Sequence, residues 1–307
     1  MQKLNPYLRW FILGGTLFFI AKTLRDHWQE VASIRVGAEA WGYLAIALAI
    51  TLLAHIWTGW VWGWILAGLN YPVSGVWSSR VYLQTNIAKY LPGNVWHFYG
   101  RAWAAKAVGI PLEIASLSVL LEPLLMAAAA LIVALVSSPS DYKSLQLLGL
   151  GAVLVAVHPR SLNPAIRLVG RLKKPKTTVD LDSNAENSAP TVPPIQHYPF
   201  LPLLGELIFL GLRGAGFCFT VLALSAIAWD QVPLLLGAFS VAWLLGLIIP
   251  GAPGGIGVFE ATAIALLDHH FPPAMVVSAV ALYRLVSLLA ELAGAGLAWC
   301  GRRMLQP

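Results

Sequence analysis

The sequence predicts an all-α polytopic membrane protein with about 7–8 transmembrane helices, two broken or re-entrant hairpins and an internal repeat. Hydrophobic residues make up 58% of the 307 positions and charged residues 11%, whereas soluble domains average roughly 45–50% and about 25%. The apolar residues lie in long runs, two of which are interrupted by proline and glycine. Interrupted backbone at membrane depth is tolerated only beside protein or water. These runs leave no room for a large soluble catalytic domain.

The first membrane half covers residues 1–157 and opens with the apolar run Trp10–Ala21. Two bases precede this run and no small-residue cleavage site follows it, so we expect an uncleaved first span. Further spans are expected at Trp41–Leu69, Leu112–Val136, Leu145–Val157, Phe200–Trp229, Val232–Ile249 and Ala274–Cys300. The small residues Gly59 and Gly63 in the second span favour close helix packing.

A polar linker, residues 158–199, separates the first half from a second membrane half at 200–300, and residues 301–307 form a tail. The first part of the linker is rich in arginine and lysine, with apolar residues on one helical face, which indicates an interfacial helix. The rest is polar and proline-punctuated, so we expect it to be disordered. Because basic loops favour the cytoplasmic side, we expect the linker in the cytoplasm of a cell-membrane protein.

Two segments, about 74–110 and about 251–273, do not fit simple spans. The first contains no acid and the bases Arg80, Lys89, Arg101 and Lys106, while the second contains no base and the acids Glu260 and Asp268. The backbone is broken at Pro92 and Gly93 in the first, and at Pro253, Gly254, Gly255 and Gly257 in the second. Glycine permits tight turns, so both segments are expected to be re-entrant hairpins.

The two hairpins also match in position along the chain. A shift of 161 positions places Pro92-Gly93 on Pro253-Gly254 and Pro111 on Pro272, and an apolar span follows in both copies. This match predicts two related halves. Transporters built from repeats place broken helices and substrate sites where the repeats meet, so we expect a site between the hairpins.

A family resemblance rests on two pairs of strings, NIAKYLPGNVWHFYGRAWAAKAVG with SVLLEPLL, and IIPGAPGGIGVFEATAIALL with ALYRLVSLLAEL. They resemble the signature regions of the lysylphosphatidylglycerol synthase transmembrane family, over about residues 10–300. The resemblance implies a stand-alone membrane module that handles or translocates a lipid. The larger synthases add an aminoacyl-transferase domain that uses charged tRNA, so we do not expect this chain to synthesise the lipid. Phe259 stands where family members commonly have a base.

Charged residues inside the spans are candidates for function, because a charge at the bilayer centre costs roughly 2.5–3.5 kcal/mol on insertion scales. Glu206 and Arg213 share one helical face of the fifth span, and Arg284 and Glu291 share one face of the last span. Parallel helices would pair Glu206 with Arg284 and Arg213 with Glu291. Glu122, in the third span, is an alternative to Glu206 as the ion-pair partner of Arg284. The alternative to a substrate site is a set of buried ion pairs that fixes helix register.

These pairings also predict a topology. With the linker in the cytoplasm and the second hairpin re-entrant on that side, the last span runs outward, parallel to the fifth. This leaves Arg302 and Arg303 outside, against the positive-inside preference. We side with the buried charges, because an unpaired buried charge costs several kcal/mol, against about 1 kcal/mol per base near anionic lipid.

Further candidates lie in the first hairpin, where His97 and Arg101 are four positions apart and share a face if the segment is helical. With Lys89 and Lys106 they are suited to bind a phosphate, while Glu260 supplies the anionic side. The alternative for the bases is snorkelling toward lipid headgroups. Asp268, His269 and His270 lack further ligands at helical spacing, so we expect neither a metal nor a cofactor.

The sequence therefore predicts an integral membrane protein that translocates a phosphate-bearing lipid without hydrolysis. A second hypothesis is a non-catalytic scaffold for a membrane glycosyltransferase partner, and a third is an enzyme acting on a lipid-linked sugar with Glu260 or Glu122 as general base. No Walker loop, G-x-S-x-G or H-E-x-x-H motif is present, which favours a protein that is not an enzyme. The +6 net charge lies at span ends, so nucleic-acid binding is not expected.

Overall fold

The computed structural model of this chain describes residues 37–90, 95–137, 143–164, 197–249 and 253–303. Within these ranges it contains helices and no strands, which confirms the all-α fold class. Five helical segments are long and apolar enough to cross a bilayer, so the chain is a multi-pass membrane protein. The expected first span, the Pro92-Gly93 break and most of the linker lie outside the described residues.

The helices of the first half follow the apolar runs of the sequence closely. They are α3 (Ala38–Gly68), α4 (Gly75–Asn86), the 3-10 turn η1 (Ile87–Tyr90), α5 (Trp96–Ala107), α6 (Leu112–Ser137) and α7 (Lys143–Ala156). The Ser74 hydroxyl accepts the backbone N–H of Trp77 and so caps α4, satisfying a donor that a helix start leaves free. Gly59 and Gly63 let α3 lie against α4, since a Cβ on Gly59 would stand 2.6 Å from the Ser79 backbone.

The helices of the second half repeat this order. They are α9 (Phe200–Leu222), the 3-10 turn η2 (Trp229–Gln231), α10 (Val232–Ile248), the 3-10 turn η3 (Pro253–Gly255), α11 (Val258–Leu267) and α12 (Pro273–Arg303). Shifted by 161 positions, 96–107 becomes 257–268, close to α11, and 112 becomes 273, the first residue of α12. The bounds of these two helices therefore correspond at this shift, and the internal repeat itself stays a prediction.

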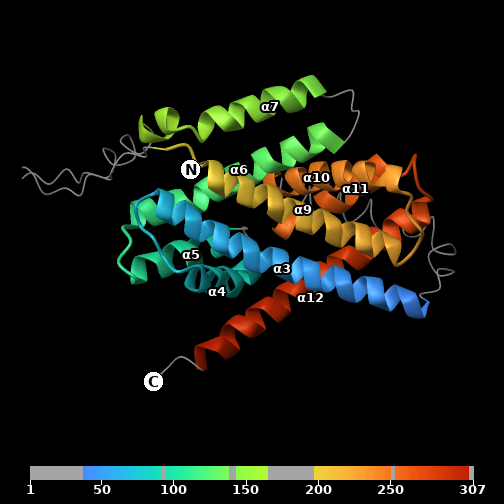
Figure 1. Cartoon of the computed structure of the whole chain (residues 1–307), viewed down its shortest axis with the longest axis horizontal. Helices are drawn as coiled ribbons and strands as arrows, with labels where there is room; N and C mark the ends of the chain where they lie inside the picture. The colour runs from blue at the N-terminus through green and yellow to red at the C-terminus, as the bar shows by residue number, and fades with distance from the viewer. Residues whose placement is uncertain (1–36, 91–94, 138–142, 165–196, 250–252, 304–307) are drawn as a thin grey trace, which may run out of the picture.

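The two hairpins enter the molecule from opposite ends. In Figure 1, α4 and α5 lie at the left end, where α3 finishes and α6 begins, and α10 and α11 lie toward the right end, where α9 finishes and α12 begins. Their tips, η1 and η3, are in contact. The meeting point lies inside the bundle, where the tips and the long helices surround the same cavity.

The second tip depends on its glycines. Gly254, Gly255 and Gly257 have φ angles of 61°, 71° and 91°, a region that side chains with a Cβ adopt at a cost. A Cβ on Gly254 would also stand 2.7 Å from the ring of Tyr90, in the other tip. These angles agree with the expectation that the glycines permit a tight turn, and the re-entrant course in the membrane stays a prediction.

The direction of the last helix differs from the prediction. In Figure 1, α9 runs from left to right and α12 runs back from right to left, ending near the side where α9 starts. The expectation that the last span is parallel to the fifth is therefore wrong. The reason is that the sequence interpretation had residues 251–273 enter and leave on the side where the sixth span ends, whereas α11 runs back beside α10 to the end of the molecule where α12 begins.

Candidate functional site

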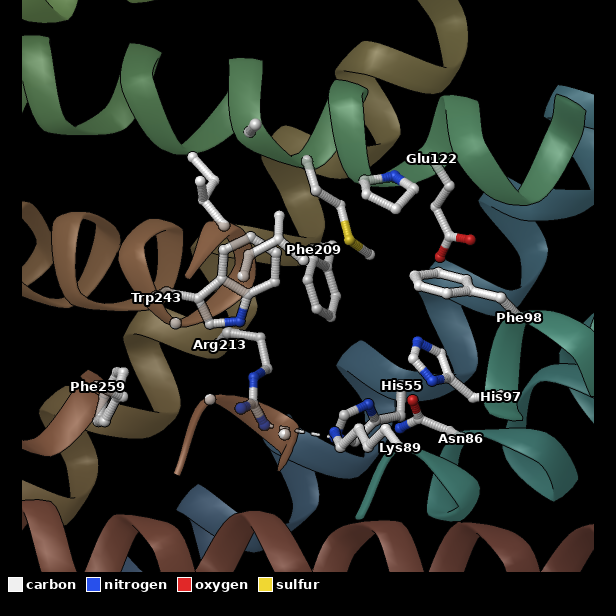
Figure 2. A pocket seen from close by; sticks show the side chains of 18 of the residues that line it. His55, Asn86, Lys89, His97, Phe98, Glu122, Phe209, Arg213, Trp243 and Phe259 are labelled. Carbon is white, nitrogen blue, oxygen red and sulfur yellow. Dashed lines mark hydrogen bonds between the residues drawn. The ribbon is translucent and has the colours of Figure 1, made fainter. Parts of the chain in front are cut away.

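The hairpin tips and the long helices enclose a cavity of about 500 Å³. Figure 2 shows Arg213, His55, Lys89, Asn86 and His97 gathered on one side of it, with Phe209 and Trp243 nearer α6. The polar or charged lining residues are His55, Tyr82, Asn86, Lys89, His97, Arg101, Glu122, Arg213, Tyr283, Arg284 and Glu291. The cavity therefore has one strongly polar side and one apolar side.

A chain of contacts forms the polar side. Lys89, from the first hairpin tip, donates through Nζ to Glu291 Oε1 at 2.6 Å. His55 Nε2 stands 3.4 Å from the same Oε1 and 3.4 Å from Nη1 of Arg213. His55, Arg213 and Glu291 are all buried. This network joins the first hairpin to α3, α9 and α12.

Arg101 and Glu122 form a second buried pair, which ties α5 to α6. The Arg101 Nη1 group donates to Glu122 Oε2, and its guanidinium lies over the rings of Tyr82 and Phe98 at 4.5 and 5.4 Å. Pro123, the residue after Glu122, lies inside α6 and removes one backbone hydrogen bond there. His97 lies one turn before Arg101 in α5 and is also buried.

Arg284 and Glu260 fix the second hairpin. The Arg284 Nε group donates to Glu260 Oε1, while Nη1 and Nη2 donate to the carbonyls of Gly254 and Gly255 at 3.1 and 2.9 Å. The other carboxylate oxygen, Oε2, accepts the Gly257 N–H at 2.5 Å. Glu260 is not among the cavity-lining residues. Both side chains thus hold the broken backbone of η3 against α12.

The ion pairs predicted between the fifth and last spans are wrong. Glu206 contacts the Thr58 hydroxyl at 3.4 Å rather than Arg284, and Glu291 pairs with Lys89 rather than Arg213. Glu122 binds Arg101, not Arg284. The spacing along two helices could not show that the hairpins insert between them and supply Lys89 and Glu260 as closer partners.

In the part of the chain that the structure describes, these contacts leave one positively charged residue of the cavity, Arg213, without a carboxylate partner. Among the described residues, Lys89, Arg101 and Arg284 each have a carboxylate within 4.0 Å and Arg213 has none. Arg213 is buried, its Nε has no hydrogen-bond partner, and its guanidinium lies 5.2 Å from the Tyr283 ring centre. A buried charge is costly unless it is paired. The geometry is suited to an anion from outside the protein.

The apolar side of the cavity leads to the outer surface of the helix bundle. Leu120 on α6 and Ile248 on α10 both line the cavity, yet their exposed fractions are 62% and 59%. Val153, on the short helix α7, lines the same side. Exposed apolar side chains of a membrane-spanning bundle face lipid, so we infer that the cavity opens sideways toward the hydrocarbon.

Most of the candidates from the sequence meet in this cavity. Those that line it are Lys89, His97, Arg101, Glu122, Arg213, Arg284 and Glu291. Lys106, Glu206 and Glu260 do not line it. Lys106 is exposed, with Nζ 4.9 Å from the Trp103 ring centre. Pro92 and Gly93 lie outside the described residues, and in the described ranges no three acids, histidines or cysteines form a metal cluster.

His55 is the polar cavity residue that the sequence interpretation missed. A signal was present, since Thr51, His55 and Thr58 lie on one face of an otherwise apolar helix and all three are buried. Asn86, the last residue of α4, was also missed, although it lies only three positions before Lys89, which lines the cavity from η1. Phe209 and Trp243 could not be told from ordinary core aromatics by sequence alone.

Comparison with known proteins bears on the whole of this structure. A search of curated proteins finds no match. The family model described as the lysylphosphatidylglycerol synthase TM region matches residues 8–294, which include both hairpins and every cavity residue. The chain therefore belongs to the lysylphosphatidylglycerol synthase transmembrane region family.

Proposed function

We propose that this protein binds the phosphate-bearing headgroup of a membrane lipid in the cavity and moves the lipid between the two leaflets. The observation that carries the proposal is Arg213, a buried guanidinium without a carboxylate partner in the described structure. A guanidinium binds phosphate through directed N–H groups. The headgroup phosphate then serves as the counter-ion of Arg213.

The shape of the cavity favours a lipid over a free anion. Leu120 and Ile248 line the sideways opening and are exposed on the outer surface. A lipid can place its headgroup beside Arg213 and leave its tails among these side chains, so that little apolar surface is moved into water. A free phosphate would gain nothing from an apolar opening.

The hairpins suggest how the headgroup crosses the bilayer. They enter from opposite ends and touch where Tyr90 packs on Gly254. Broken helices of this kind line the polar path in transporters built from inverted repeats. The headgroup gains access to one end at a time as one hairpin moves against the other.

The direct experiment is a lipid-movement assay with purified protein in phosphatidylcholine vesicles carrying a fluorescent phosphate-bearing lipid. The wild-type protein should equilibrate the lipid between leaflets, and Arg213→Gln should slow this at least tenfold, the loss of one charge-assisted contact of about 1.5–3 kcal/mol. Arg160→Gln is the matched control, because Arg160 is exposed and lies outside the cavity.

The result also separates the other two hypotheses from this one. Protein that binds the lipid but never moves it would favour a scaffold or an enzyme over a translocator. Lipid movement at the wild-type rate in the Arg213→Gln variant would refute the role proposed for Arg213. We propose no catalytic role, because Glu122 and Glu260, the two acids considered as general bases, are each held in an ion pair with an arginine.

A further inference from the structure

Two buried acids, Glu122 of α6 and Glu206 of α9, lie near a single cation, Arg101. Glu122 and Glu206 have exposed fractions of 1% and 0%. Arg101 binds Glu122 Oε2 and acts on Glu206 only through its charge. Glu122 Oε1 and Glu206 Oε2 have no hydrogen-bond partner. Glu206 is thus a buried titratable group that the proposed headgroup site does not use.

The surroundings of Glu206 contain no second cation in the described structure. The groups that face it are Thr58 from α3, Tyr82 from α4, Arg101 from α5 and Glu122 from α6. The neighbouring α10 carries no titratable residue. Two charged residues of α12, Arg284 and Glu291, bind Glu260 and Lys89. Two carboxylates and one guanidinium therefore leave one excess negative charge within this cluster, while the unpaired cation Arg213 lies seven residues further along α9.

An excess buried charge is costly, and a single bound proton removes it. We propose that the Glu122–Glu206 pair is a proton-binding site coupled to the anion site at Arg213. One proton from the aqueous phase occupies the pair when the headgroup phosphate binds, and it leaves when the headgroup leaves. The proposal rests on the proposed function, to which it adds a proton that moves with the lipid.

The distance along α9 gives the expected strength of this coupling. Glu206 and Arg213 are seven residues apart on one helix, about 10 Å along the axis. A negative charge on Glu206 competes with the headgroup phosphate for Arg213 and so weakens anion binding there. At an effective dielectric constant of about 20, loss of this charge raises the anion affinity about tenfold. By thermodynamic linkage, lipid binding must raise the proton affinity of the pair by the same factor by which proton binding raises the lipid affinity.

The experiment measures binding of phosphatidylglycerol, a monoanionic phosphodiester, to the protein in phosphatidylcholine nanodiscs from mildly alkaline to mildly acidic pH. Wild-type affinity should rise about tenfold as the pH falls. Glu206→Gln, which keeps the shape and removes the charge, should bind tightly at every pH. Glu39→Gln is the matched control, because Glu39 is exposed near the start of α3 and should keep the wild-type pH dependence.

A second measurement needs no variant and so does not depend on how Glu206→Gln folds. In weak buffer, wild-type protein should take up protons when phosphatidylglycerol is added, and phosphatidylcholine alone should cause no uptake. Binding that is independent of pH, without proton uptake, would overturn the proton site and leave the headgroup site intact. A pH dependence that persists in Glu206→Gln would assign the proton to His55 or His97 instead. Absence of phosphatidylglycerol binding at every pH would overturn the proposed function itself.

Discussion

At the scale of single residues, the cavity separates two kinds of buried arginine. Arg101 has a carboxylate partner and Arg213 has none among the described residues. The sequence identified both as candidates, Arg213 as a charge inside a span and Arg101 as a base that shares a helical face with His97 in the first hairpin. It could not tell them apart, since the difference depends on Glu122 and on side chains from other helices.

The difference predicts opposite effects on stability. Arg101→Gln should lower the free energy of unfolding by about 3–5 kcal/mol, because it leaves Glu122 buried and unpaired. Arg213→Gln removes a buried charge and leaves no carboxylate without its ion-pair partner. The free energy of unfolding of this variant should therefore equal or exceed that of the wild-type protein. Thermal unfolding in detergent measures both. Equal, large losses in the two variants would show that Arg213 has a stabilising partner within the protein.

A second residue-scale prediction concerns Glu260 and Arg284. Glu260→Gln should destabilise the second hairpin by about 3–5 kcal/mol, since Arg284 loses its acid. The double variant Glu260→Gln, Arg284→Gln should recover part of this loss, because neither charge is then left alone. Hydrogen exchange at residues 253–257 reports the hairpin directly. Unchanged hydrogen exchange in the Glu260→Gln variant would contradict the role of the Glu260–Arg284 pair in holding the second hairpin.

At the scale of elements, helix bounds were predictable because apolar length and Pro-Gly breaks determine them. Leu112–Val136 was expected where α6 covers Leu112–Ser137, and Ala274–Cys300 where α12 covers Pro273–Arg303. What the sequence did not reveal is how the elements meet. The contact of Tyr90 with Gly254 joins residues far apart in the chain, and no local pattern encodes it.

That contact predicts the behaviour of the hairpin tips. Gly254→Ala should destabilise the protein by about 1–3 kcal/mol, because the new methyl group meets the Tyr90 ring and the backbone has φ 61°. Adding Tyr90→Ala should restore part of the loss, leaving the backbone strain. Gly151→Ala is the control, since a Cβ there meets nothing within 4 Å. An unaltered melting temperature for Gly254→Ala would show that the tips do not pack closely.

At the scale of the whole molecule, the direction of α12 resolves a conflict within the sequence. The buried charges argued for a last span parallel to the fifth, and Arg302 and Arg303 argued against it. With α12 running back, its end and the start of α9 lie at the same end of the molecule in Figure 1. The basic linker before α9 and the basic end of α12 can then share one side, as the positive-inside rule favours.

This arrangement predicts that the tail is cytoplasmic. A single cysteine at Gln306, with Cys300 and Cys218 replaced by serine, should react with an impermeant thiol reagent only after the cells are permeabilised. Ser161→Cys, at the start of the linker, should behave in the same way. Labelling of Gln306→Cys in intact cells would place the two basic segments on opposite sides and contradict the observed direction of α12.

The central claim is that Arg213 binds the phosphate of a lipid headgroup, and native mass spectrometry of protein purified in mild detergent tests it most directly. The wild-type protein and Arg160→Gln should each retain a phosphate-bearing lipid. Arg213→Gln should lose it while remaining folded, with affinity reduced at least tenfold for a charge-assisted contact of about 1.5–3 kcal/mol. Equal lipid retention by all three proteins would contradict the account.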